Sequence, residues 1–292
     1  MRESIESETS VSNAGTLYIV ATPIGNLEDI APRAIRLLSE ADIIAAEDTR
    51  HSSKLLAQFG ISTKTEPLHE HNERSQVPRL VELLKAGKSI AYITDAGTPL
   101  VSDPGFHLVR SARQAGITVT PVPGACAAIA ALSAAGLPSD RFVFEGFPPA
   151  KTAARRAAFE KLRAETRTLI FYESPHRIIE SLTDMRDIFG PGREAAIARE
   201  LTKKFETVHD GTLTELLDWI RGDANRQLGE FVILIHGVTR AEREAVDAEA
   251  ARILKILLEE MPVSQATALA ARITGLKKNR LYDYALRLKQ TR

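Results

Sequence analysis

The residues best suited to chemistry lie in one stretch, Ile93-Thr-Asp-Ala-Gly-Thr-Pro-Leu-Val-Ser-Asp-Pro-Gly105. It carries two acids, Asp95 and Asp103, and hydroxyls at Thr98 and Ser102. Its glycines let a backbone approach a ligand closely, and its prolines fix the path of the chain. An apolar run precedes the stretch and an amphipathic run follows it. It is therefore predicted to be a loop between the carboxyl end of a strand and a helix, where open α/β sheets bind small molecules.

Similar polar clusters follow the other apolar runs. They are Ala21-Thr-Pro-Ile-Gly-Asn-Leu-Glu-Asp29, Glu47-Asp-Thr-Arg-His51, Pro123-Gly-Ala-Cys-Ala127, Phe171-Tyr-Glu-Ser-Pro-His-Arg177 and Ala198-Arg-Glu-Leu-Thr-Lys-Lys204. Each has a simpler interpretation taken alone: a connecting turn, a helix N-cap at Asp48 or Thr49, tight helix packing, or solvated charge. Because several such clusters fall on strand ends, we favour one ligand site built from many loops.

Other kinds of site are disfavoured. Neither Gly-x-Gly-x-x-Gly nor Gly-x-x-x-x-Gly-Lys-[Ser/Thr] occurs, which argues against a usual dinucleotide fold, a phosphate loop and the commonest methyltransferase fold. His69 and His71 would face the same way on a strand, but no third ligand at metal spacing accompanies them, so no metal site is predicted. Cys126 lies in an apolar run and is expected to pack rather than to act as a nucleophile.

The elements that must position these loops alternate regularly. Strands at 16–21, 42–46, 89–93 and 118–122 alternate with helices, which predicts a mostly parallel sheet in an N-terminal α/β domain, 14–124. Closely spaced strands predict a mixed sheet in a second α/β domain, 125–238. From 241 to 292 only helices are expected, and Ser264 is expected to cap the start of the second of them. Thr274-Gly275 before a basic helix has the shape of a helix-turn-helix unit. Residues 1–13 are polar and are expected to form a disordered tail.

Composition restricts the class of protein further. The chain has 292 residues, 44% of them hydrophobic, and equal numbers of basic and acidic side chains, so any nucleic-acid contact must come from local patches. Its one cysteine excludes an internal disulfide framework and fits a reducing, cytoplasmic setting. The polar start is no signal peptide, and no apolar run approaches the length of a membrane span.

Five of these motifs resemble those of a known family. Thr22-Pro-Ile-Gly-Asn-Leu27, Glu47-Asp-Thr-Arg50, Thr94-Asp-Ala-Gly-Thr-Pro99, the cluster from Phe171 and the cluster from Ala198 are similar to the motifs of the small-subunit ribosomal RNA ribose 2′-O-methyltransferases. That family belongs to the tetrapyrrole methylase-like group. The resemblance runs from about Gly15 to the C-terminus. It implies two α/β domains of the tetrapyrrole methylase type with a cleft between them, a homodimer, S-adenosyl-L-methionine as methyl donor, and a cytidine ribose in the small subunit as acceptor.

The resemblance also implies site residues. The positions implied for donor binding are Pro23, Asp95, Gly97, Thr98, Pro99, Leu100, Val101, Cys126, Ala127, Tyr172, Ala198 and Glu230. Within this set, Thr98 to Val101 should hold the donor, whereas Asp95, like Asp103 outside the set, could serve only to brace the loop. Gly97-Thr-Pro99 stands where many corrinoid-directed relatives have Gly-Asp-Pro, and this favours the RNA-directed branch.

A ribose hydroxyl is a weak nucleophile, so a base or a nearby cation should assist it. The candidate catalytic residues are Lys203, Glu200, Arg199 and Asp48. Lys203 would be a base if burial lowered its pKa, or an electrostatic partner if it stayed charged. RNA affinity needs cations along a backbone path. The candidates are Arg50, Lys54, Arg155, Arg156, Lys277, Lys278 and Arg280.

Two other functions remain open from the sequence. A tetrapyrrole (corrinoid or porphyrin) methyltransferase would use the same cofactor fold, but would give the basic C-terminal helices no purpose. A non-catalytic helix-turn-helix nucleic-acid binder would not need polar loops at so many strand ends.

Overall fold

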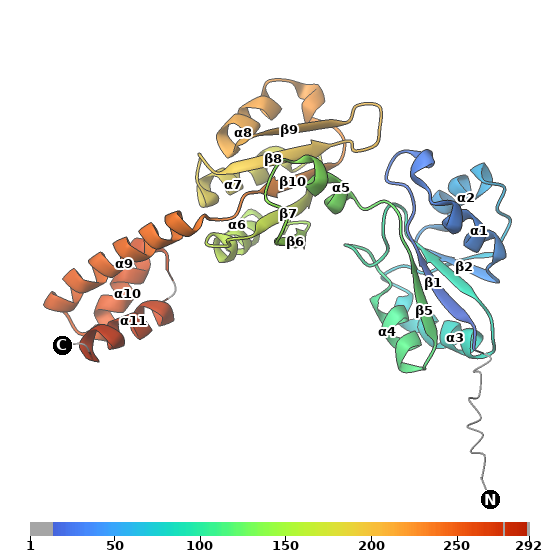
Figure 1. The fold of residues 1–292 in the computed structure, drawn as a ribbon, viewed down its shortest axis with the longest axis horizontal. Coiled ribbons are helices and arrows are strands. Elements are labelled where there is room, and N and C mark those ends of the chain that lie inside the picture. Colours follow the sequence, from blue (N-terminus) through green and yellow to red (C-terminus); the bar gives the residue numbers. More distant parts are fainter. Residues whose placement is uncertain (1–13, 277, 291–292) are drawn as a thin grey trace, which may run out of the picture.

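Two α/β units and a helical unit follow one another along the chain in a computed structural model (Figure 1). The structure describes residues 14–276 and 278–290, with the side chains of 240–248, 280 and 287–290 left out of the description. The prediction of a disordered tail at 1–13 therefore lies outside the described residues. The fold class is confirmed: two sheets with helices on both faces, then a C-terminal bundle of helices.

The first sheet is entirely parallel, in the order β3-β2-β4-β1-β5. Its strands are β1 (Thr16–Val20), β2 (Ile43–Ala46), β3 (Thr65–Pro67), β4 (Ile90–Ile93) and β5 (Thr118–Val122). Two helices, α1 (Pro32–Glu40) and α2 (Thr49–Gln58), bury Leu38 and Leu56 against one face. On the other face, α3 (Glu73–Lys85) and α4 (Phe106–Gln114) bury Leu80 and Leu108. The β/α alternation in the sequence arises because parallel strands need such crossover helices.

The second sheet is mixed, as predicted, in the order β6-β7-β10-β8-β9 with only β6 and β7 parallel. Its strands are β6 (Phe142–Gly146), β7 (Thr168–Glu173), β8 (Glu194–Arg199), β9 (Thr207–Thr212) and β10 (Phe231–Ile235). The small-residue helix α5 (Ala127–Ala134) packs Ala131 on one face of the sheet. Three helices cover the opposite face: α6 (Thr152–Leu162), α7 (Ile178–Phe189) and α8 (Leu213–Arg221).

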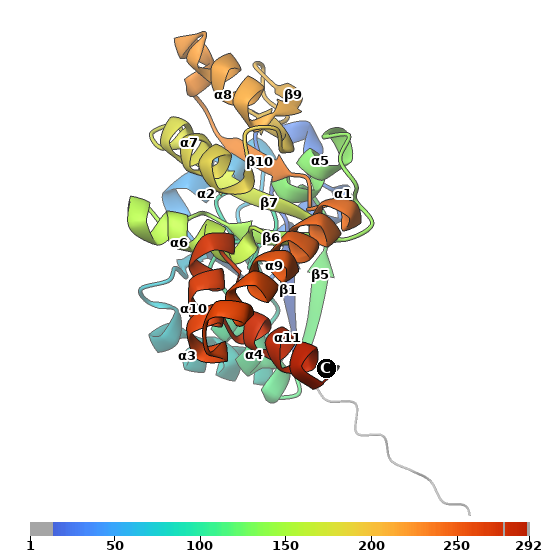
Figure 2. The ribbon, with the colours of Figure 1, turned by 90° about the vertical axis from the view of Figure 1, so that its left-hand side faces the viewer.

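The C-terminal unit consists of α9 (Arg240–Glu260), α10 (Val263–Thr274) and α11 (Lys278–Gln290). These helices have a core of their own, including Leu254, Ala270 and Leu281, and extend away from the second sheet (Figure 1). Figure 2 views the molecule from their side, so that they lie in front of the two α/β units. Gly275 ends α10 with a φ of 71°, a left-handed conformation that glycine adopts without strain. The prediction that Ser264 caps α10 is wrong, because the helix begins at Val263 and its N-cap is Pro262, with no side-chain cap.

This topology brings the polar clusters to one region. In a parallel sheet all carboxyl ends share an edge, so the loops after β1, β2, β4 and β5 lie together. In the second sheet β10 runs antiparallel to β7 and β8, so its first residue lies beside the last residues of those strands: Phe231 pairs with Glu173 and Arg199. No helix of the described residues is long and apolar enough to cross a membrane.

Candidate active site

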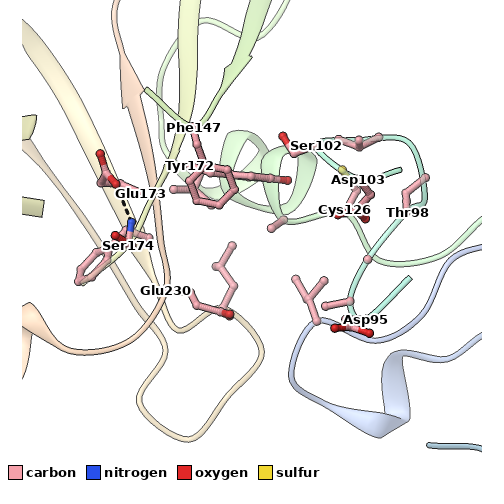
Figure 3. A pocket seen from close by; sticks show the side chains of 18 of the residues that line it. Asp95, Thr98, Ser102, Asp103, Cys126, Phe147, Tyr172, Glu173, Ser174 and Glu230 are labelled. Carbon is pink, nitrogen blue, oxygen red and sulfur yellow. Dashed lines mark hydrogen bonds between the residues drawn. The ribbon is translucent and has the colours of Figure 1, made fainter. Parts of the chain in front are cut away.

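A cavity of about 450 Å³ lies between the two sheets, where these loops meet (Figure 3). Asp95, Thr98 and Cys126 come from the first unit and the loop that leaves it, and Tyr172 and Glu230 come from the second (Figure 3). Nine of the residues predicted for donor binding line it: Asp95, Gly97, Thr98, Val101, Cys126, Ala127, Tyr172, Ala198 and Glu230.

Three predicted donor residues, Pro23, Pro99 and Leu100, are not among the lining residues. Ile24, which follows Pro23, lines the cavity in its place. Leu100 has a φ of 72°, and its side chain packs against the core beneath α3 and α4. Pro23, in the loop after β1, and Pro99 and Leu100, in the loop after β4, thus belong to the loops of the site without lining the cavity.

The site also contains residues that were not predicted to bind the donor. They are Ile24, Glu47, Ala96, Ser102, Asp103, Phe147, Glu173, Ser174, Pro175, Leu201, Phe231 and Val232. Many of them directly follow a strand in the motifs quoted above, so their position after a strand could have identified them. Phe231 and Val232 begin a strand, and only the antiparallel direction of β10 brings them to this edge.

Backbone contacts join the loops of the first unit. Thr22 and Gly97 form an isolated antiparallel bridge, with N···O distances of 2.9 and 3.1 Å. The hydroxyl of Thr98 donates to the carbonyl of Ala125 at 3.0 Å. A Cβ on Gly124 would lie 2.9 Å from the Cβ of Ala21, so this turn needs glycine to fit against the first strand. The loops after β1, β4 and β5 are thus held as one wall.

The backbone of the loop after β4 is strained as well as held by hydrogen bonds. Leu100 and Ser102 have φ values of 72° and 66°, in a region that non-glycine residues rarely adopt and that costs about 1 kcal/mol or more for each residue. Such backbone persists only where the surroundings hold it, and it is concentrated at functional sites. The strain therefore supports the assignment of this loop to a binding site.

The opposite wall is aromatic. The ring of Tyr172 packs edge-on against Phe144 and Phe147, with centroid distances of 4.9 and 5.5 Å. Its hydroxyl accepts a hydrogen bond from the backbone N–H of Ala128 at 3.1 Å, at the start of α5. Burial raises the pKa of Tyr172 above its ordinary value, so the phenol stays neutral. This contact links β7 to the segment that carries Cys126 and Ala127.

Every ionisable side chain of the described residues that lines the cavity, Cys126 and Tyr172 apart, is a carboxylate: Glu47, Asp95, Asp103, Glu173 and Glu230. Burial raises the pKa of Glu47, and the neighbouring charges of Asp103, Asp95 and Asp48 raise it further. Burial, with the charge of Asp95, also raises the pKa of Asp103. Repulsion between like charges in a desolvated wall favours the binding of a cation there. Among the described residues no three potential ligands are grouped to hold a metal ion.

Lys203 lies at the rim of this cavity. Its ammonium contacts Glu200 at 2.9 Å and Glu230 at 2.8 Å. Burial lowers the pKa of Lys203, but the hydrogen bonds to the two carboxylates outweigh burial and leave the pKa above its ordinary value. Burial likewise raises the pKa of Glu200, and the bonds from Lys203 and the N–H of Glu230 bring it below the usual value. Of the two predicted roles for Lys203, these contacts favour the charged partner over the base.

The other two catalytic candidates have structural partners. The guanidinium of Arg199 donates to the carbonyls of Leu228, Asn225 and Phe205 at 2.6, 2.7 and 3.4 Å, and Arg199 does not line the cavity. Asp48 is the N-cap of α2 and accepts from the N–H groups of Arg50 and His51. Its own N–H donates to Asp95 at 3.2 Å. Arg199 and Asp48 therefore hold loops of the site in place.

The structure corrects the prediction that Arg155 contacts RNA. Its side chain is 1% exposed and donates to Asp184 at 2.7 Å, beneath α7. Arg156 is 42% exposed, but it too is paired, with Asp184 and Asp187. The basic run on α6 was misread because its pattern of charge does not show that Asp184, a residue of α7, lies opposite.

The two neighbouring arginines predict a contrast in stability. Arg155→Met should lower the free energy of unfolding by about 2 kcal/mol or more, because it removes the buried partner of the Asp184 carboxylate and leaves only the half-exposed Arg156 beside it. Arg156→Met, the matched control on the same helix, should cost less than about 1 kcal/mol, since that side chain is half exposed. Urea unfolding of the three proteins measures both changes. Equal losses in the two variants would contradict the assignment of the buried pair.

The remaining RNA candidates are surface residues where the structure describes them. The side chain of Arg50 is 92% exposed, at the start of α2 beside the loop after β2. Lys54, one turn further along, and Lys278, at the start of α11, are also exposed. Lys277 lies outside the described residues, as does the side chain of Arg280.

Comparisons with known proteins agree with this architecture. The family model of the Tetrapyrrole (Corrin/Porphyrin) Methylases matches residues 16–217, and that of the RsmI C-terminal HTH domain matches residues 244–289. Among solved structures, uroporphyrin-III-C-methyltransferase from Thermus thermophilus aligns with a TM-score of 0.53 at 22% identity, over 80% of this chain and 98% of that one. A diphthine synthase aligns with a TM-score of 0.57 at 15% identity, over 79% and 94% of the two chains. At these identities the likeness shows the fold.

Curated relatives match over nearly the whole chain. Ribosomal RNA small subunit methyltransferase I of Pseudomonas aeruginosa is 58% identical, over 94% of this chain and 98% of the relative. The protein of the same name from Vibrio cholerae is 55% identical, and that from Escherichia coli O157:H7 is 52% identical, each over 96% of this chain and 98% of the relative. With its fold, its interdomain cavity and its C-terminal helices in agreement, the chain belongs to the ribosomal RNA small subunit methyltransferase I family of the tetrapyrrole methylases.

Proposed function

We propose that this protein transfers a methyl group from S-adenosyl-L-methionine to the ribose 2′-hydroxyl of a cytidine in small-subunit ribosomal RNA. The single observation that carries the proposal is the acidic cavity between the sheets. Glu47, Asp95, Asp103 and Glu230 place carboxylates around a space of about 450 Å³, and its other wall is aromatic. The fifth carboxylate, that of Glu173, is bound by Arg177 on the side of α7. This is a site for a cation with an apolar portion.

The donor fits these residues. A sulfonium and an amino group are attracted by Glu47, Asp95 and Asp103, and an adenine has an apolar surface beside Tyr172 and the tight turn at Cys126–Ala127. When bound, the donor supplies a methyl group already activated by the sulfonium. The protein therefore has to align the two reactants and exclude water.

Lys203 supplies electrostatic assistance at the acceptor side. Its charge is maintained by Glu200 and Glu230, and Glu230 also lines the cavity. A fixed positive charge near the ribose oxygen favours the ionised hydroxyl and stabilises the negative charge that develops there as the proton leaves. Glu200 and Glu230 hold the ammonium in place, and water or an RNA phosphate accepts the proton.

Two groups of features support RNA as the acceptor. The curated relatives are named for ribosomal RNA, and the C-terminal helices match a helix-turn-helix model. Arg50 and Lys54 lie in the first two turns of α2, which follows the loop after β2, and their exposed side chains are suited to phosphate contacts. We also propose RNA contacts for Lys277, Lys278 and Arg280 in the C-terminal unit.

Further parts of the proposal concern assembly and place. We divide the chain into domains at 14–124, 125–238 and 241–292, since each range encloses its own buried clusters. A homodimer is supported by the family resemblance and by exposed apolar side chains on α5 and β6, Ile129 and Phe142. We also propose a cytoplasmic location, because the small ribosomal subunit is the proposed acceptor.

The test is transfer of labelled methyl groups from S-adenosyl-L-methionine to purified small subunits, to naked ribosomal RNA and to a porphyrin precursor. Label should appear in RNA and survive alkaline hydrolysis as a 2′-O-methylcytidine dinucleotide. Label only in the porphyrin precursor would replace the proposal with a tetrapyrrole methyltransferase. No binding of the donor in a calorimetric titration would leave a non-catalytic nucleic-acid binder.

A further inference from the structure

The hairpin between β8 and β9 carries an exposed aromatic side chain beside the cavity. Ala198 and Leu201, on either side of the strand end, line the cavity, and the hairpin continues through residues 202–206. At its far end Phe205 is 64% exposed, the largest exposed fraction among the large apolar side chains described. The ammonium of Lys204 lies 5.6 Å from the centre of the Phe205 ring.

The backbone of this hairpin is held in a strained conformation. Glu200 and Thr202 have φ values of 51° and 66°, although neither is glycine. Hydrogen bonds hold the turn: the N–H of Lys203 donates to the carbonyl of Glu200 at 3.0 Å, and that of Glu206 donates to Lys203 at 3.1 Å. This conformation costs about 1 kcal/mol or more for each of the two residues, and such strain is concentrated at functional sites. The strain therefore indicates a function for the turn of this hairpin.

Arg199 ties the hairpin to a second loop. Its guanidinium binds the carbonyls of Phe205, on the hairpin, and of Asn225 and Leu228, on the segment before β10. Leu228 is itself 59% exposed. The Arg199 guanidinium thus fixes the backbone of Phe205 and Leu228, whose apolar side chains are both exposed to solvent. This arrangement forms a platform, defined here as Phe205 and Leu228.

The hairpin also reaches the first unit. A Cβ on Gly25 would lie 2.4 Å from Cγ of Lys203 and 3.0 Å from Oγ1 of Thr202, so the loop after β1 packs directly on the hairpin. Figure 1 shows the same approach, with the turn between β8 and β9 directed towards the first unit. The platform therefore lies at the rim, just outside the position of Lys203.

We propose that Phe205, with Leu228, is a stacking platform for an unpaired base of the RNA, flanking the nucleotide whose ribose is methylated. Phe205 does not line the cavity in which the methyl transfer takes place. It is therefore placed to contact a nucleotide next to the one that reacts. An aromatic face stacks on any base, and Lys204 beside it attracts the phosphates of the same strand. Arg199 is a positioning residue for this platform. The inference rests on the proposed function, because it presupposes an RNA acceptor.

The experiment uses the full-length protein, a single-stranded RNA oligonucleotide covering the methylated site, and small subunits as methyl acceptors. Phe205→Ala should weaken RNA binding about 10-fold, within the range for loss of one stacked base. The KM for RNA should rise accordingly, with the Kd for the methyl donor unchanged. Phe205→Trp should keep wild-type affinity, and its fluorescence should be quenched by RNA. Phe205→Leu, which is apolar but not aromatic, should resemble Phe205→Ala.

Phe106→Ala is the matched control. Phe106 is also a well-exposed phenylalanine, 57% exposed, with a cation over its ring, Arg110 at 5.8 Å, but it starts a helix of the first unit. Wild-type RNA affinity in Phe205→Ala, or full affinity in Phe205→Leu, would overturn the platform. So would an equal loss in Phe106→Ala. Failure of the wild-type protein to methylate RNA would refute the proposed function. Methylation by the wild type together with unchanged RNA affinity in Phe205→Ala would refute the platform alone.

Discussion

Lys203→Met is expected to slow single-turnover methylation about 100-fold, while the Kd for S-adenosyl-L-methionine changes little. Methionine keeps the aliphatic stem, which packs on Gly25, but removes the charge between Glu200 and Glu230. Loss of one fixed charge or donor at an oxygen that becomes negative in the transition state costs a factor of about 100 or more. Rapid-quench measurement with saturating donor and RNA isolates this step from binding and product release.

The pH dependence separates the two possible roles of Lys203. A lysine acting as base would give a rate that rises with pH until its lowered pKa is passed. Here the pKa is raised by its two carboxylate partners, so the side chain stays protonated through the neutral range. The contribution of Lys203 should therefore be constant between pH 6 and 9, and the ratio of wild-type to variant rates should be flat.

Lys85→Met on α3 is the control, since Lys85 also pairs with a glutamate, Glu82, at 2.8 Å but lies away from the cavity. It should methylate at the wild-type rate. A Lys203→Met protein that is as fast as the control would remove Lys203 from the mechanism. A rate ratio that grows with pH through neutrality would restore the base.

The carboxylates of Glu47 and Asp103 are expected to have a large effect on the affinity for the methyl donor. Glu47→Gln combined with Asp103→Asn should weaken S-adenosyl-L-methionine about 30-fold and the product S-adenosylhomocysteine much less. The product lacks the sulfonium charge, so it loses less of the attraction. A charge interaction worth about 2 kcal/mol at an effective dielectric constant near 20 corresponds to this factor. Isothermal titration of the two ligands gives the ratio directly, without any assay of activity.

The same carboxylates predict a pH effect with a definite sign. The pKa values of Glu47 and Asp103 are raised, so these carboxyls become neutral at a higher pH than ordinary carboxyls as the solution is acidified. Affinity for the donor should be complete at pH 8 and fall as the pH drops towards 5. The double variant should show a much flatter dependence. A wild-type affinity that is independent of pH, or equal losses for donor and product, would contradict charge recognition.

The stability of the protein alone provides a check on this reasoning. A carboxyl whose folded-state pKa is raised binds its proton more tightly in the folded state, so its ionisation opposes folding above that pKa. The double variant lacks this opposition. It should therefore unfold at a higher temperature than the wild type at pH 8, and the difference should shrink as the pH falls through the raised pKa values.

Much of the architecture could be predicted from local patterns. Alternating apolar runs and amphipathic segments predicted both sheets, the mixed character of the second, and the helical end of the chain, because burial of a strand or helix face leaves a period in the sequence. Glycine, proline and acids directly after apolar runs located most of the cavity wall. The start of α10 was misjudged because Pro262, not Ser264, precedes its first turn.

By itself, the sequence determined which strand ends carry polar groups and that they would meet, since parallel strands align their carboxyl ends. Only the tertiary structure decided what each charged side chain does. Arg155 is buried because Asp184 lies opposite, Lys203 stays charged because Glu200 and Glu230 bond its ammonium, and Arg199 is occupied by carbonyls of two loops. Asp184 is 29 positions from Arg155 in the chain, and Glu230 is 27 positions from Lys203. Burial and charge state depend on which distant groups replace water around a side chain, and local sequence does not record those groups.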